Sequence, residues 1–196
     1  MPKRVFLIMC FVVAGLLTAQ RMAWSRQVSP HVFNGVEALT GFGDSQLEEK
    51  GAYQSVPLFI DFDFNLKALA GIKDFYPPGI LQFQVEPFIA GVFEPKANLE
   101  TGNSFFLKVG VFPETWKFQP YIKAGIGAAF MTEHAAEQAT QWNFIESYVV
   151  GAHYFLTDAV AVTAEGRFRH MSNAGRKLPN HGINTDLYLA GVSYFF

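Results

Sequence analysis

A histidine and a serine lie two residues apart near the carboxyl end of the chain, at His170 and Ser172. In an extended strand this spacing places both side chains on one face, about 6–7 Å apart along the backbone. An imidazole that reaches a serine hydroxyl can remove its proton, which is how a general base activates a serine nucleophile. The same two groups could instead hydrogen-bond to lipid headgroups at the rim of a membrane protein, so the spacing alone leaves both readings open.

The segments that must position this pair alternate apolar and polar residues with a period of two, which predicts strands rather than helices. The expected strands cover residues 30–42, 51–66, 80–94, 103–112, 118–131, 141–156, 158–171 and 184–196. Turn residues separate them, including Pro77-Pro78-Gly79 and Thr101-Gly102-Asn103. Most of these strands are long enough for the roughly ten tilted residues that cross a bilayer. The pattern therefore predicts an all-β fold, an eight-stranded antiparallel β-barrel of the outer-membrane type.

The two faces of the strand that carries the pair differ in polarity. Even positions such as Val160 and Phe168 are apolar, whereas odd positions such as Arg167 are charged. A barrel in lipid has an apolar outer face and a polar lumen, although a soluble sandwich would bury the same apolar face in its core. In a barrel, His170 and Ser172 point outward, where polar groups are costly. Their position there suggests that they act on the lipid itself.

The opposite face predicts a charged interior. Glu165, Arg167 and Arg169 share it, and Asp61 and Asp63 lie on the polar face of another strand. Because eight-stranded barrels are filled by side chains, we expect these groups to form structural ion pairs in the lumen rather than a pathway for ions.

Composition supports an exported membrane protein. Of 196 residues, 50% are hydrophobic and 21 are Phe, whereas only 16% are charged. The formal net charge of −2, with no basic run, argues against nucleic-acid binding. Lys3 and Arg4 precede an apolar run over residues 5–17, shorter than the ~20 residues of a membrane-spanning helix. We therefore expect a signal peptide over residues 1–25 and one barrel domain over residues 26–196.

The last predicted strand also indicates a membrane protein. Tyr188, Tyr194 and Phe196 share one of its faces, and the sequence ends on Phe196. Such a strand resembles the signal that bacterial barrel-assembly machinery reads. With an export signal, it predicts a location in the outer membrane of a Gram-negative bacterium.

The stretch His170–Gly175, followed by Pro179, Asn180 and Gly182, resembles the active-site segment of the PagL-type lipid A 3-O-deacylases. The resemblance implies an outer-membrane serine esterase that removes the 3-hydroxyacyl chain from position 3 of lipid A, the lipid part of lipopolysaccharide. It also implies that no metal or diffusible cofactor is needed. By the same resemblance, Ser172 is the nucleophile and His170 its base, and Asn173 and Gly175 help to form the oxyanion hole.

One position departs from that family. Its acid falls fourteen residues after the histidine, and here this position is Asn184. An amide oxygen can accept a hydrogen bond from the imidazole and fix its tautomer, but it cannot stabilise an imidazolium by charge. Asp186, one pleat further along the same face, is a candidate substitute. We therefore expect catalysis at a reduced rate.

Two other functions stay open. The substitution at Asn184 is compatible with a catalytically weak or inactive barrel that binds lipopolysaccharide or has a structural role. A small solute or adhesion barrel is disfavoured, because the predicted loops are mostly short. The expected partners are lipid A, the surrounding outer-membrane lipid and the barrel-assembly machinery, and the sequence leaves open a homodimer.

Overall fold

The computed structural model describes residues 26–47, 51–69, 77–133 and 135–196. The signal peptide expected over residues 1–25 lies outside them. The strands are β1 (Phe33–Gln46), β2 (Ala52–Asn65), β3 (Leu81–Glu94), β4 (Asn98–Gly110), β5 (Phe118–Met131), β6 (Trp142–Phe155), β7 (Val160–Ser172) and β8 (Ile183–Phe195). A four-residue helix, α2 (Leu66–Leu69), follows β2. Within the described ranges, no helix is long and apolar enough to cross a membrane.

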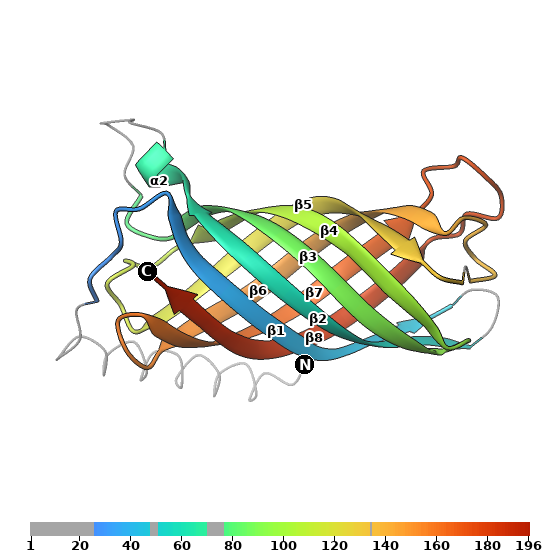
Figure 1. Ribbon diagram of the computed structural model, residues 1–196, viewed down its shortest axis with the longest axis horizontal. Coiled ribbons are helices and arrows are strands. Elements are labelled where there is room, and N and C mark those ends of the chain that lie inside the picture. Colours follow the sequence, from blue (N-terminus) through green and yellow to red (C-terminus); the bar gives the residue numbers. More distant parts are fainter. Residues whose placement is uncertain (1–25, 48–50, 70–76, 134) are drawn as a thin grey trace, which may run out of the picture.

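The strands form one closed barrel, shown in Figure 1. Each strand pairs antiparallel with the next along the chain, and β8 closes the barrel by pairing antiparallel with β1. Closure leaves no strand edge unpaired, which is what a sheet exposed to lipid requires. The predicted eight-stranded antiparallel barrel is confirmed.

The sequence-based boundary was wrong at the start of β4. Thr101-Gly102-Asn103, predicted as a turn, lies inside this strand, which begins at Asn98. Gly102 serves packing instead, because a Cβ at this position would overlap the backbone oxygen of Ala128 and the ring of Phe88. A glycine inside a strand commonly marks such a close approach.

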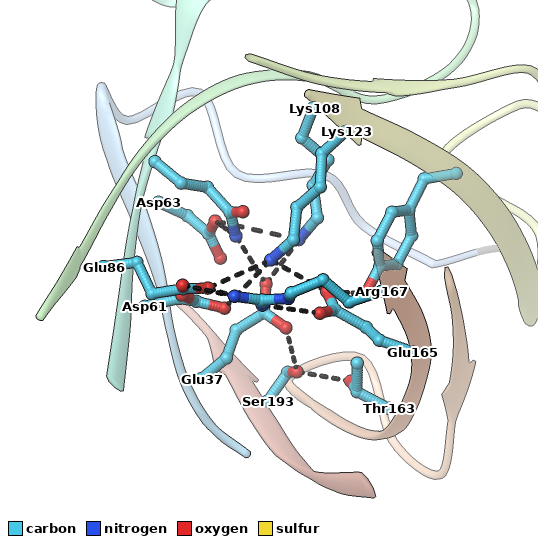
Figure 2. Close-up of polar contacts among 12 residues, drawn as sticks. Glu37, Asp61, Asp63, Glu86, Lys108, Lys123, Thr163, Glu165, Arg167 and Ser193 are labelled. Atoms are coloured by element: carbon cyan, nitrogen blue, oxygen red, sulfur yellow. Dashed lines mark hydrogen bonds and ion pairs between the residues drawn. The ribbon is translucent and has the colours of Figure 1, made fainter. Parts of the chain in front are cut away.

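Charged side chains fill the lumen, as Figure 2 shows. Arg167 contacts Glu86 at 2.5 and 2.7 Å and Glu165 at 2.9 Å. Lys123 contacts Glu165 at 2.8 Å and Asp61 at 3.4 Å. The prediction that charged side chains form ion pairs in the lumen is therefore confirmed, although the sequence did not indicate which residues would pair.

The lumen becomes apolar toward the end of the barrel where β7 joins β8. Met171 and Ile183 point inward there and are fully buried, and they belong to one apolar cluster. The other members of the cluster are Leu39, Tyr53, Phe59, Phe88, Val92, Ala129, Met131, Ala135, Ile145, Leu187 and Leu189. This packing fixes the inner face of the two strands whose outer face carries His170 and Ser172.

Candidate active site

His170 lies on the outer face of β7, two residues before the strand ends. It pairs across the β7–β8 ladder with Asn184, and its Nδ1 donates a hydrogen bond of 2.6 Å to Asn184 Oδ1. An amide oxygen can only accept, so Nδ1 must carry the proton. In the neutral ring, Nε2 is then the unprotonated atom, which is the form that a general base needs.

Ser172 follows on the same outer face, as the alternation predicted. Both it and His170 are half-buried, whereas Met171 between them is fully buried. The pair partner of Ser172 on β6 is Phe144. Within the described residues, no hydrogen bond joins Ser172 to His170. Catalytic hydrogen bonds are often long before substrate binds, so this geometry is compatible with a base and its nucleophile.

The chain turns sharply after Ser172 through two left-handed residues, Ala174 (φ 55°) and Gly175 (φ 73°). A positive φ is unusual and strained for alanine, and such strain concentrates at functional sites. Asn173 makes two hydrogen bonds within the loop: its backbone N–H donates to Asn180 Oδ1 at 2.9 Å and its side-chain amide donates to the Lys177 carbonyl at 2.7 Å. Asn173 therefore holds the loop in this structure.

The two expected oxyanion donors, Asn173 and Gly175, therefore differ in whether their backbone N–H already makes a hydrogen bond. The hydrogen bonds of the described residues include none from the Gly175 N–H. This N–H is thus available to a developing negative charge, whereas the N–H of Asn173 would first have to leave Asn180.

A second loop braces the first one. Residues 135–141, before β6, lie beside the β7–β8 loop at the end of the barrel opposite the C-terminus (Figure 1). Ala139 N–H donates to the Pro179 carbonyl, and His181 N–H donates to the Glu137 carbonyl, both at 3.0 Å. Sequence reasoning missed this contact, because no local signal reports that two loops far apart in the chain will meet.

Comparison with known proteins gives the family and the fold of this chain. Residues 56–193 match the family model described as lipid A 3-O-deacylase (PagL). The chain belongs to this family. The fold is similar to the crystal structure of the outer membrane enzyme PagL, with 18% identity, a TM-score of 0.57, and coverage of 81% of this chain and 97% of that one.

A second solved structure has the same fold. It is Neisserial surface protein A (NspA), with 17% identity, a TM-score of 0.57, and coverage of 83% of this chain and 97% of that one. The comparison with curated protein sequences returned no match. Family and fold together confirm a barrel of the outer membrane and a member of an ester-hydrolase family.

At the family's acid position, the structure places the amide of Asn184 in hydrogen-bond contact with the imidazole. Asp186 also faces outward, but its cross-strand neighbours are Phe168 on β7 and Asp44 on β1. It is therefore diagonal to His170, at about 7–8 Å between backbone positions. No hydrogen bond between His170 and Asp186 occurs among the described residues. Asp186 thus stays a candidate rather than an observed partner.

An apolar groove of about 620 Å³ lies on the outer wall of the barrel, and neither His170 nor Ser172 lines it. Its upper end is formed by Tyr148 and Phe168, a cross-strand pair one pleat below His170. Gly166 on its floor has no Cβ and leaves open space. The remaining lining is Leu107, Val109, Ile122, Lys123, Ala124, Val149 and Val150.

Gly182 holds the imidazole in place from the loop side. Its φ is +82°, and a Cβ there would lie 2.6 Å from Cε1 of His170. We expect Gly182→Ala to displace the ring and to lower kcat by about tenfold to a hundredfold, because misplacement by about 1 Å can have an effect of that size. The measurement is release of 3-hydroxy fatty acid from lipid A by the purified barrel.

Gly51→Ala is the matched control for this prediction. Gly51 has a similar φ of +89° in another loop at the same end of the barrel, but a Cβ there would meet no atom within 4 Å. It carries the same backbone strain without the contact to His170. Equal losses in both variants would mean that strain, rather than the position of the imidazole, explains the effect.

Proposed function

We propose that this chain removes the 3-O-linked 3-hydroxyacyl chain from lipid A by a serine-esterase mechanism. The observation that supports the proposal best is the hydrogen bond from His170 Nδ1 to Asn184 Oδ1, because in the neutral ring it leaves Nε2 as the proton acceptor, on the face that carries Ser172. The site also opens onto lipid rather than onto the lumen, where an ester of a membrane lipid would lie.

In the proposed first step, Ser172 Oγ attacks the ester carbonyl of the acyl chain while His170 Nε2 takes its proton. The Gly175 N–H is the available donor to the oxyanion, and Asn173 is the second candidate after the loop adjusts. His170 then gives the proton to the oxygen at position 3 of the sugar, which leaves as an alcohol. Water then attacks the acyl-enzyme while His170 Nε2 takes its proton, and His170 returns a proton to Ser172 Oγ as the 3-hydroxy fatty acid is released.

The apolar groove below the site fits the acyl part of this substrate. Leu107, Ile122 and Val150 offer an alkyl chain an outer wall without hydrogen-bonding groups. Its upper end lies one pleat below His170, so a chain in the groove would place its carbonyl at the level of the loop.

A second function is favoured by the same amide at Asn184. With no charge to stabilise an imidazolium, the barrel could bind lipopolysaccharide without turning it over at a useful rate. We further propose that residues 1–25 direct export, that the barrel-assembly machinery inserts the barrel, and that any homodimer forms in the membrane.

Mass spectrometry of lipid A separates the two functions. Gram-negative cells that express the native chain should lose the mass of one 3-hydroxyacyl group, and cells that express His170→Ala should not. An unchanged lipid A mass with a folded native barrel would overturn the esterase and leave the binding role. Loss of the same group with His170→Ala would overturn the proposed mechanism.

A further inference from the structure

A second polar side chain faces outward beside His170. Glu146 lies on the outer face of β6, between Ile145 and Ser147, which point inward and are 2% exposed. Its cross-strand neighbours are Ile126 on β5 and His170 on β7. An acidic group in the lipid-facing wall of a membrane protein is costly and is a functional-site hypothesis by default.

The surroundings of Glu146 are otherwise apolar. It lines a groove of about 590 Å³ on the outer wall. On the same face, Phe144 and Tyr148 flank it along β6. The contacts of the described residues include no hydrogen bond or ion pair of the Glu146 carboxylate. Of the four residues that flank it on this face, only His170 can become positively charged.

Arg176 is a cation of the neighbouring loop, and it has a contact of its own. Its guanidinium lies over the ring of Phe144, 4.6 Å from the centroid. This places it on an aromatic face, where a cation is stabilised by the ring. The contact leaves the cross-strand position beside Glu146 to His170.

A negative charge at this place would speed the hydrolysis. When His170 takes the proton of Ser172, its ring becomes an imidazolium, and the oxygen of Asn184 holds the ring without a compensating charge. Side chains directly opposite on neighbouring strands have Cβ atoms about 4.5–5.5 Å apart. A carboxylate at that distance, in apolar surroundings, interacts strongly with an imidazolium.

We propose that Glu146 supplies, from β6, the negative charge that stabilises protonated His170 in this chain, in place of the acid that the family carries at the position of Asn184. The inference rests on the proposed esterase function. The two roles of the family's acid are thus divided between two residues. Asn184 on β8 fixes the tautomer of His170, and Glu146 on β6 compensates its charge. Glu146 acts through His170 and does not touch the substrate, so it is a positioning residue.

The first test is Glu146→Gln, which keeps the shape and removes the charge. We expect kcat for release of 3-hydroxy fatty acid from lipid A in vesicles to fall by about tenfold, with KM within about twofold, because only the charged transition state is affected. Glu146→Asp should recover part of the loss. Glu94→Gln removes an exposed carboxylate at the end of β3 and should leave kcat unchanged.

The second test repeats Glu146→Gln in an Asn184→Glu background. A carboxylate at position 184 makes the one at 146 redundant, so the loss should shrink to about threefold or less; such non-additivity identifies coupled groups. A structural role of Glu146 would give equal losses in both backgrounds. Migration of the unheated barrel in gels reports whether each variant is folded.

The outcomes separate this inference from the proposed function. An active native chain whose kcat does not respond to Glu146→Gln, or responds equally in both backgrounds, overturns the role of Glu146 and leaves the esterase intact. A folded native chain without activity contradicts both, because the inference requires turnover with an amide at position 184.

Discussion

Ser172→Ala is expected to lower kcat for lipid A deacylation by about 10⁴-fold or more, the scale on which loss of a serine nucleophile acts in serine hydrolases. The variant removes one oxygen atom from a half-buried position on the outer face of β7, opposite Phe144. The hydroxyl makes no hydrogen bond within the described part of the chain, so the fold should not depend on it. Turnover of purified protein in lipid A vesicles measures the effect.

The double variant Ser172→Ala/His170→Ala makes this prediction sharper. Nucleophile and base act as a unit, so the two losses should not add, and the double variant should be about as slow as either single one. Ser29→Ala, which changes a half-buried serine before β1, is the control and should keep full activity. A Ser172→Ala protein that retains more than a tenth of the native rate would exclude the proposed nucleophile.

The orientation of the site could be read from the sequence because it depends on parity alone. Once residues around Val160 and Phe168 alternate with charged ones, His170 and Ser172 must share the apolar face, whatever the shape of the barrel. His170 and Asn184, fourteen residues apart, are also in contact, because they lie on consecutive strands, β7 and β8, and face each other across the ladder.

The contacts that the sequence did not predict are those between strands or loops far apart in the chain. The meeting of Lys123 with Glu165 and Asp61 depends on barrel closure and stagger, which no local pattern encodes. Glu146 escaped notice for the same reason: its neighbour His170 is fixed by the register of β6 on β7. The turn predicted at Gly102 was wrong, because glycine occurs both in turns and where two segments pack closely inside a sheet.

Arg167→Leu is expected to destabilise the barrel by about 3–5 kcal/mol, because removal of one partner leaves buried charges uncompensated. Arg167 is fully enclosed, donates to Glu86 and Glu165, and lies over the ring of Phe59 with 4.3 Å to its centroid. The same buried network contains Lys108, which pairs with Glu37 and Asp63, and Lys123, which pairs with Asp61, Glu86 and Glu165 (Figure 2). Leucine would leave the two lysines to balance these carboxylates.

Urea unfolding of the barrel in detergent micelles measures this change. Lys96→Ala is the matched control, since Lys96 pairs with Glu133 at 2.9 Å in an exposed position, and loss of such a pair should cost at most about 1 kcal/mol. A loss below about 1 kcal/mol for Arg167→Leu would mean that the lumen tolerates the uncompensated charge, by taking up protons or water, and that Arg167 does not hold the wall together. A large loss would mean that the buried network supports the strand on whose outer face His170 and Ser172 stand.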